Sequence, residues 1–420
     1  MEMVTDEKTS KRKQFLLIFV VVGIYFANVF CRSTVGANIT NFADEYGISE
    51  NQTSIVSLIS TFFFFAYGVG QITNSFFITK YNKRFSLSIP VFVYGILTLL
   101  MFFKWNFGVY KFIWAGSGIC CSFLWMSIMK ILSENLDDKY LNRASLLLST
   151  GGGIGGASCY FLSSLFTHLN HYRLVFLVGG IMLLFFITFF FIISWNYKCS
   201  PKEYDNPDAV EKKYEKITRP KFAFIILTAL IIFAPISNIG CESLKTWTPS
   251  ILKKGFDLPS TIAIFFGGVL PLVVPIYSPI TIIAHRKIRA KYQAIIATVM
   301  TITSISMGLV LLALNYRQLA LFIILVSIGC LCFAILNGIL TNLLMLEIRN
   351  YYDSGALSGV MNGAAHIGSV LSTYVVKVIV EKTEWNVLFI ILCSCALFVA
   401  IISATVFLVF RKKPEYSRFL

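Results

Sequence analysis

The amino-acid sequence predicts an all-α membrane protein with twelve transmembrane helices arranged in two six-helix halves. Of its 420 residues, 56% are hydrophobic and only 14% are charged. This leaves too few polar side chains to cover a water-soluble surface. Apolar stretches of about 20 residues, the length of a membrane-spanning helix, recur along the chain. One charged segment near the middle separates them into two equal sets.

Each of the twelve stretches predicts one transmembrane helix. The first six are Phe15–Val35, Ile55–Ile78, Leu87–Phe103, Phe107–Ile131, Ser145–Phe166 and Leu174–Trp195. The second six are Phe222–Trp247, Ile262–Ala284, Ala294–Leu314, Leu319–Leu346, Gly355–Val380 and Val387–Phe410. Transmembrane β-strands would instead alternate apolar and polar residues over about ten positions. Runs such as Phe62–Phe65 lack that alternation, so we expect helices.

The first stretch follows the basic residues Lys11, Arg12 and Lys13, an arrangement that is also typical of a signal peptide. The stretch is longer than the apolar core of a signal peptide, which has about 7–15 residues, and it contains Arg32. We therefore interpret it as a retained first helix.

The basic residues indicate how the helices are oriented in the membrane. The N-terminus, every second loop and the C-terminus together hold 26 Lys and Arg residues, and the opposite loops and their flanks hold 9. Because basic residues gather on the cytoplasmic side, we expect both termini in the cytoplasm and a multi-pass protein of the cell membrane. The net charge of +15 then reflects topology, and we expect no nucleic-acid partner.

The charged segment at 196–220 has eleven charged residues in 25 and predicts a cytoplasmic linker. It separates two halves, 1–195 and 221–420, whose similar size suggests a duplicated unit with the substrate path between them. The fifth and eleventh helices are both rich in glycine, which allows close helix packing. A nucleotide-binding loop would need a preceding strand, which is absent around Gly151–Gly156. Pro271, Pro275 and Pro279 predict a bend in the eighth helix.

Metal and cofactor sites are not expected. The ten cysteines are scattered through the helices without metal-ligand spacing, and we interpret them as small packing residues without disulfides. The predicted membrane segments contain no paired acids and no nucleophile motif, so we do not expect an enzyme.

Arg32 is the most informative residue, because it lies inside an apolar helix. An arginine there costs at least about 2.5–3.5 kcal/mol in hydrocarbon, so it should face a polar cavity and have a partner. Its planar guanidinium suits a carboxylate or phosphate ligand. A protein acid, helix carbonyls or the extracellular interface could also satisfy it.

The seventh helix ends in a polar cluster that includes Asn238, Glu242 and Lys245. Glu242 and Lys245 are three residues apart and share a helix face, so a local ion pair is one interpretation. The other makes Glu242 a proton-coupling carboxylate and Lys245 a ligand for the substrate. Trp247, next to this cluster, could mark the membrane interface.

Further polar residues form the rest of the candidate site. His366 in the eleventh helix is either a hydrogen-bonded packing residue or a coupling group. Tyr25 and Asn28 precede Arg32 by seven and four residues and so lie along its helix face. The candidate substrate-binding residues are Arg32, Tyr25, Asn28, Tyr67, Gln71, Lys245, Asn362 and His366, and the candidate coupling residues are Glu242 and His366.

Three segments resemble the major facilitator superfamily, in particular its organophosphate:phosphate antiporters and organic-anion symporters. These are Tyr25-Phe26-Ala27 with Arg32, Trp247-Thr248-Pro249-Ser250-Ile251-Leu252, and GALSGVMNGAAHIGS from Gly355. The resemblance implies the major facilitator fold, alternating access, and contact between Arg32 and an anionic group of the substrate.

Two positions depart from the family pattern. Thr79 stands where the helix 2–3 loop of the superfamily has an acid. Cys241 stands where the phosphate antiporters have a second arginine, so a two-arginine phosphate clamp is absent.

The sequence therefore predicts a monomeric secondary transporter of a small organic anion, either a carboxylate or a phosphate ester. It would be coupled to a proton, sodium or a counter-anion. The alternative is a proton-coupled exporter of hydrophobic or cationic compounds.

Overall fold

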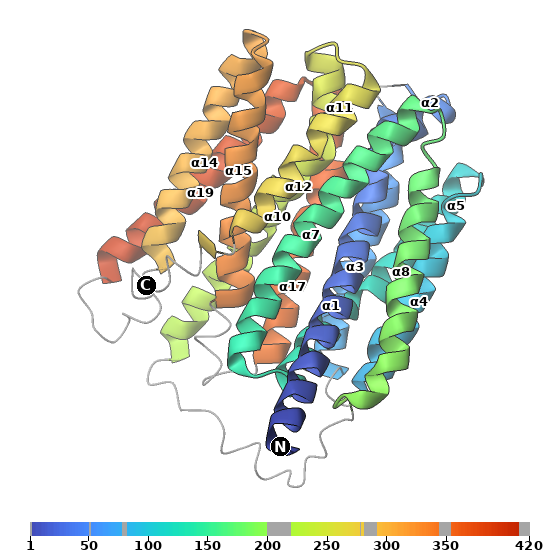
Figure 1. Cartoon of the computed structure of the whole chain (residues 1–420). Helices are drawn as coiled ribbons and strands as arrows, with labels where there is room; N and C mark the ends of the chain where they lie inside the picture. The colour runs from blue at the N-terminus through green and yellow to red at the C-terminus, as the bar shows by residue number, and fades with distance from the viewer. Residues whose placement is uncertain are drawn as a thin grey trace.

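The computed structural model describes residues 2–49, 52–77, 82–199, 220–277, 279–280, 292–343 and 354–410. Within these ranges the chain forms long helices joined by short connections (Figure 1). The earlier helices are α1 (Glu2–Ala37), α2 (Ile39–Glu45), α3 (Ser54–Phe77), α4 (Lys83–Leu100), α5 (Phe107–Ser122), α6 (Leu124–Asn135), α7 (Asp138–His168), α8 (Leu174–Ile193) and η2 (Ser194–Asn196).

The later helices complete the bundle. They are α10 (Pro220–Gly255), α11 (Ser260–Gly267), α12 (Val269–Val273), η3 (Val274–Ile276), α14 (Tyr292–Asn315), α15 (Leu319–Gly338), η4 (Ile339–Leu343), α17 (Ser354–Val370), η6 (Leu371–Val375), α18 (Val376–Lys382) and α19 (Trp385–Phe410). Every predicted span coincides with one helical passage through the bundle, so the twelve-helix architecture is confirmed. The predicted ends at Ile78, Ala284 and Leu346, and most of the predicted linker at 196–220, lie outside the described residues.

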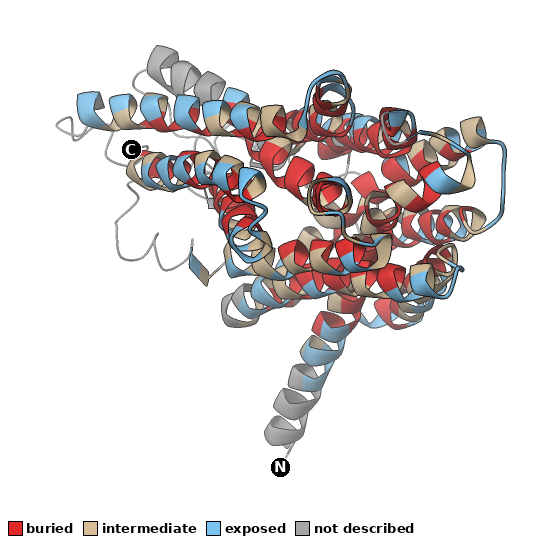
Figure 2. Cartoon of the chain, turned by 90° about the horizontal axis from the view of Figure 1, so that it is seen from above, coloured by how far each residue is buried: buried red, intermediate tan, exposed pale blue. Residues whose placement is uncertain are grey.

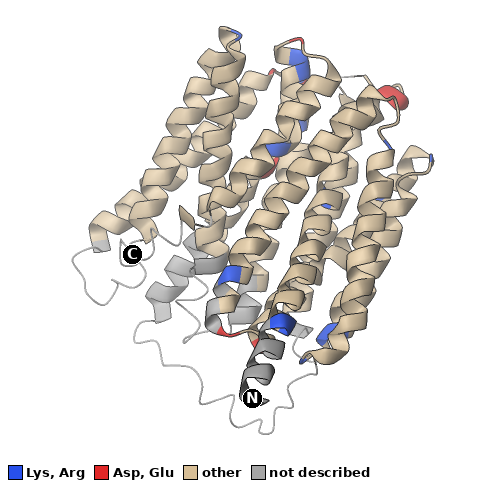
Figure 3. Cartoon of the chain, viewed as in Figure 1, with Lys and Arg blue, Asp and Glu red and all other residues tan. Residues whose placement is uncertain are grey.

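The surface of the bundle matches a lipid environment. Nine helices of the described residues are long and apolar enough to cross a bilayer, and Ser260–Ile276 is a shorter apolar helix. Large apolar side chains such as Phe65, Phe112 and Phe185 are 64–72% exposed on the outside, whereas buried residues face the interior (Figure 2). Charged residues gather near the two ends of the bundle (Figure 3). An exposed apolar surface of this extent is that of a membrane-embedded protein.

Successive passages run in opposite directions, which gives the bundle two ends (Figure 1). We call the end where α1 begins the near end, and the opposite end, where α3 begins and α18 ends, the far end. At the near end Lys83 pairs with Glu134, with Nζ 2.7 Å from Oε2. Thr79, the position of the missing family acid, lies outside the described residues.

Glycines permit close packing, as the sequence predicts. A Cβ atom on Gly155 of α7 would lie 2.4 Å from the carbonyl oxygen of Phe26 on α1. A Cβ atom on Gly363 of α17 would lie 2.4 Å from a side-chain carbon of Ile72 on α3. Both distances are far below van der Waals contact, so the glycine-rich rows bring these helix pairs together.

Several passages are interrupted. The fourth predicted span is divided at Phe123 into α5 and α6, and next to this division the Ser122 carbonyl accepts a hydrogen bond from Nε2 of Gln71 at 3.2 Å. The eighth span, in which the prolines predict a bend, is divided into α11, α12 and η3, with Pro271 in α12 and Pro275 in η3.

The seventh span continues past its predicted end at Trp247 and reaches Gly255, although Pro249 lies inside it. A proline leaves the carbonyl four residues earlier without its helical partner. Here that carbonyl belongs to Lys245, and the hydroxyl of Tyr160 on α7 donates to it at 2.8 Å. Trp247 is fully buried rather than interfacial, because its indole N–H donates to the carbonyl of Ser372 at 3.0 Å inside the bundle.

Candidate functional site: a buried ion-pair cluster

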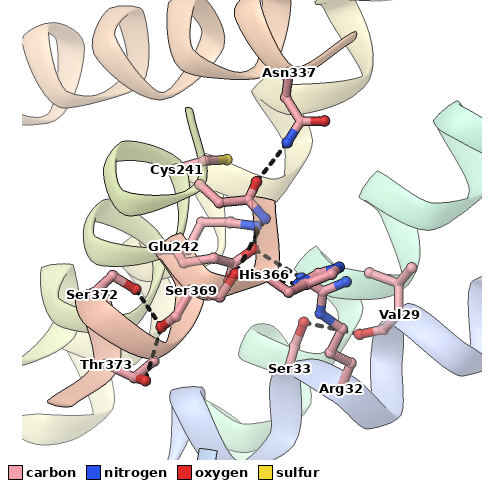
Figure 4. Close-up of polar contacts among 12 residues, drawn as sticks. Val29, Arg32, Ser33, Cys241, Glu242, Asn337, His366, Ser369, Ser372 and Thr373 are labelled. Atoms are coloured by element: carbon pink, nitrogen blue, oxygen red, sulfur yellow. Dashed lines mark hydrogen bonds and ion pairs between the residues drawn. The ribbon is translucent and has the colours of Figure 1, made fainter. Parts of the chain in front are cut away.

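Three charged residues from two helices meet inside the bundle. Nη2 of Arg32 on α1 lies 3.0 Å from Oε1 of Glu242 on α10. Nζ of Lys245, one turn further along α10, lies 2.7 Å from the same oxygen. We call Arg32, Glu242 and Lys245 the charged cluster (Figure 4 shows Arg32 and Glu242). It brings together residues more than 200 positions apart.

The cluster carries an excess of positive charge. Glu242 has only 7% of its surface exposed, while the side chains of Arg32 and Lys245 each keep 23%. One carboxylate therefore serves two cations, and both cations retain surface that a second anion could contact. Because Coulomb interactions are strong in a poorly solvated interior, this excess favours an anionic occupant.

Aromatic rings hold the guanidinium of Arg32. Its Cζ lies 5.0 Å from the ring centroid of Phe64 and 5.7 Å from that of Tyr67, both on α3. Such cation–π contacts stabilise a charged arginine without neutralising it. Phe64 is a residue that sequence reasoning missed, because it lies in a run of four phenylalanines with no signal that distinguishes it.

His366 belongs to a hydrogen-bonded network rather than to the charged cluster itself. Its ring lies 4.3 Å from the Tyr67 ring in an edge-on arrangement, and Nδ1 is 3.3 Å from Oγ of Ser369. Ser369 also accepts a hydrogen bond from Asn238 at 3.1 Å, and Asn238 accepts one from Asn337 at 2.5 Å. The network connects α10, α15 and α17 beside the charged cluster (Figure 4).

The other candidate residues have different surroundings. The ring of Tyr25 packs against that of Trp125 at 5.3 Å. Asn28 is buried and accepts a hydrogen bond from the thiol of Cys121 at 3.1 Å. Gln71 is buried and donates to the hydroxyl of Tyr67 at 3.0 Å. Asn362 is half-buried on α17.

Metal ligation is not indicated by the described part of the chain, where no group of three or more His, Cys, Asp or Glu residues could hold an ion. Sγ of Cys241 lies 3.9 Å from Sγ of Cys330.

A charged cluster enclosed in an apolar helical bundle is the arrangement of a membrane transporter, in which buried ionisable residues mark the substrate path. A family model described as Major Facilitator Superfamily matches residues 21–371, and the chain belongs to this superfamily. No curated protein matches the sequence.

Solved structures of transporters share the fold. A D-xylose-proton symporter superposes with a TM-score of 0.75 at 12% identity, covering 93% of this chain and 96% of its own. A bacterial homologue of the human lysosomal transporter Spinster, inward-facing and unoccupied, superposes with a TM-score of 0.67 at 14% identity. The match covers 97% of this chain and 96% of the homologue. The occupied form of the same homologue superposes with a TM-score of 0.65 at 13% identity, and the match covers 96% of each chain. These similarities and the family indicate a transporter rather than an enzyme.

Proposed function

We propose that the protein is a secondary active transporter of a small organic anion, a carboxylate or a phosphate ester, and that it works by alternating access. The observation that carries this proposal is the charged cluster, in which Arg32 and Lys245 share a single carboxylate oxygen of Glu242. An anionic substrate would contact both cations, which are held at the required place before the substrate arrives.

The division of the chain explains how binding would be linked to movement. In this proposal the halves are residues 1–195 and 221–420, joined by a linker at 196–220. Arg32 then belongs to one half and Glu242 with Lys245 to the other. A substrate anion that competes with Glu242 for Arg32 would replace a contact between the halves with contacts through the substrate. Binding would thereby change the relative stability of the two access states.

The charge of the site favours a particular kind of anion. The organophosphate:phosphate antiporter branch that the sequence resembles uses a second arginine, and this chain has Cys241 at that position. With Lys245 as the second cation and Glu242 beside it, a singly charged carboxylate fits well. A substrate that carries both acidic and basic groups fits equally well, since its amine could face Glu242.

Tyr25, Tyr67, Asn362 and His366 are the further side chains that we propose to surround the substrate, with Asn28 and Gln71 supporting them from buried positions. Glu242 and His366 are the proposed coupling groups, and the coupling partner is a proton, sodium or a counter-anion. Release of Glu242 from Arg32 on substrate binding would let its charge respond to a proton.

We further propose a monomer in the cell membrane with both termini in the cytoplasm. The 26 to 9 distribution of basic residues supports this orientation. The far end of the bundle is then extracellular.

A proton-coupled exporter of hydrophobic or cationic compounds is the second candidate. Glu242 and the aromatic side chains of Phe64, Tyr67 and Tyr25 favour it, since a buried acid and ring faces attract organic cations. The two cations that contact Glu242 count against it.

A thermal-stabilisation screen of the purified protein separates the two proposals. Carboxylates and phosphate esters should raise the unfolding temperature, cationic drugs should not, and Arg32→Ala should remove the effect of the anions. Stabilisation by cations alone would contradict the anion proposal and favour the exporter.

A further inference from the structure

The carboxylate of Glu381 joins the two proposed halves of the chain, 1–195 and 221–420, at the far end. Oε1 of Glu381, near the end of α18, accepts a hydrogen bond from the backbone N–H of Ser54, the first residue of α3, at 2.7 Å. Oγ1 of Thr53 donates to the same oxygen at 3.4 Å. The first N–H groups of a helix have no partner within the helix, and a negative charge there is stabilised by the helix dipole. Glu381 therefore caps a helix from the other half.

Lys377 supports Glu381 from one turn earlier. It is only 3% exposed, and its Nζ lies 3.6 Å from Oε1 of Glu381. The ammonium is also 5.3 Å from the ring centroid of Trp247 and 4.5 Å from that of Trp385. The two indole rings hold the ammonium of Lys377 in place. Lys377 in turn holds the carboxylate of Glu381 next to the start of α3.

A second ionic contact joins the two proposed halves at the far end. Nζ of Lys253 on α10 lies 3.6 Å from Oδ2 of Asp44 on α2. Between this pair and Lys377 is a pocket whose lining comes from both parts of the chain: Thr40, Ala43, Asp44, Thr53, Ser250, Lys253, Lys254, Lys377 and Trp385. Polar groups of both parts therefore meet around a small opening at the far end.

We propose that Glu381, held by Lys377, is the latch residue of an extracellular gate. The inference rests on the proposed alternating access and does not depend on the identity of the substrate. The bond to Ser54 exists only while α3 and α18 are together at the far end, and separation of the halves there must break it. Glu381 thus stabilises the state that is closed to the outside, and its loss shifts the protein toward the outward-open state.

Hydrogen–deuterium exchange of the full-length purified protein, followed by mass spectrometry without substrate, tests this proposal. In Glu381→Ala we expect exchange to become roughly tenfold faster, because the closed state loses one charge-assisted hydrogen bond. The increase should appear at the start of α3, and also in α2 and at the end of α10, whose described residues form no hydrogen bond or ion pair with Glu381. Glu381→Gln, which keeps an acceptor but loses the charge, should give a smaller change in the same segments.

Glu384→Ala is the matched control, because Glu384 is an exposed carboxylate three residues further along in the turn before α19. It should leave exchange in all these segments unchanged. If Glu381→Ala accelerates exchange only at the start of α3, or not at all, Glu381 is a local helix cap and the latch is wrong. A failed anion screen would not alter this result, so the two proposals fail independently.

Discussion

Arg32 and Glu242 form an ion pair between α1 and α10, with Nη2 of the arginine 3.0 Å from Oε1 of the carboxylate. The same oxygen lies 2.7 Å from Nζ of Lys245. Breaking a pair in such a poorly solvated site by removing one partner leaves an uncompensated charge, which costs several kcal/mol. In the proposed function, a substrate anion would replace Glu242 as the partner of Arg32, while Glu242 would keep its contact with Lys245.

Substitution of Glu242 tests its proposed role in coupling. Glu242→Gln removes a charge that can respond to a proton, so we expect transport in proteoliposomes to lose its dependence on a proton gradient. Uptake measured with and without an imposed gradient provides the comparison. Asp257→Asn, which alters an exposed ion pair with Arg317, should behave as the unmodified protein. If Glu242→Gln keeps its full gradient dependence, this carboxylate does not couple transport to protons.

The aromatic support of Arg32 is tested at Tyr67. Tyr67→Leu removes one ring face from the guanidinium, and we expect anion affinity to fall about two- to fivefold, corresponding to about 0.5–1 kcal/mol. Tyr67→Phe keeps the ring and loses only the hydroxyl that accepts from Gln71, so its affinity should stay close to that of the unmodified protein. Isothermal titration measures both. Equal losses in the two variants would show that the hydroxyl, and not the ring, matters.

A substitution of Tyr160 tests how Pro249 is accommodated in α10. Tyr160→Phe removes the hydroxyl that donates to this carbonyl, which Pro249 leaves without a helical partner. We expect a destabilisation of about 1 kcal/mol and a lower thermal midpoint. Tyr316→Phe is the control, because Tyr316 is 76% exposed and should tolerate the change. An unaltered midpoint in Tyr160→Phe would mean that the hydrogen bond contributes nothing to stability.

The twelve helices were predictable, because hydropathy and segment length are properties of the local sequence. The contact of Gln71 with the Ser122 carbonyl beside Phe123 was not, since the two residues are 51 positions apart in the chain. Arg32 and Glu242 were each identifiable as charged residues in apolar helices. Their contact was not, since helix carbonyls or the membrane interface could have satisfied the arginine equally well.

Lys377 illustrates the same difficulty at the end of a helix. It lies three residues before the end of the predicted span at Val380, and its neighbours in the sequence do not indicate a partner for it. The structure buries it between Trp247 and Trp385, which come from different helices. A tertiary cage of this kind leaves no local pattern in the sequence.

The carboxyl group of Glu45, at the far end, predicts how the stability of the protein depends on pH. Burial raises the pKa of Glu45, but hydrogen bonds from Tyr172 and Arg173 outweigh this effect, so its pKa lies below the ordinary value. A lowered pKa stabilises the folded protein above the ordinary value of about 4.3, and this stabilisation is lost as the pH falls through that value toward the lower folded pKa.

Glu45→Gln should therefore lower the thermal midpoint at neutral pH and flatten its decline between about pH 6 and pH 3. Thermal melts of the purified protein across this range give the comparison. Parallel curves for the two proteins would contradict the assignment.

Anion binding by Arg32 is tested by the affinity of Arg32 variants for the anion that stabilises the protein most strongly in the screen. Isothermal titration should show at least a tenfold loss for Arg32→Gln, since about 1.4 kcal/mol of lost interaction is already tenfold. Arg32→Lys should give a smaller loss, because it keeps the charge without the planar fork. Arg317→Gln, at an exposed arginine, should bind normally. Near-normal affinity in Arg32→Gln would contradict the proposal that Arg32 contacts an anionic substrate.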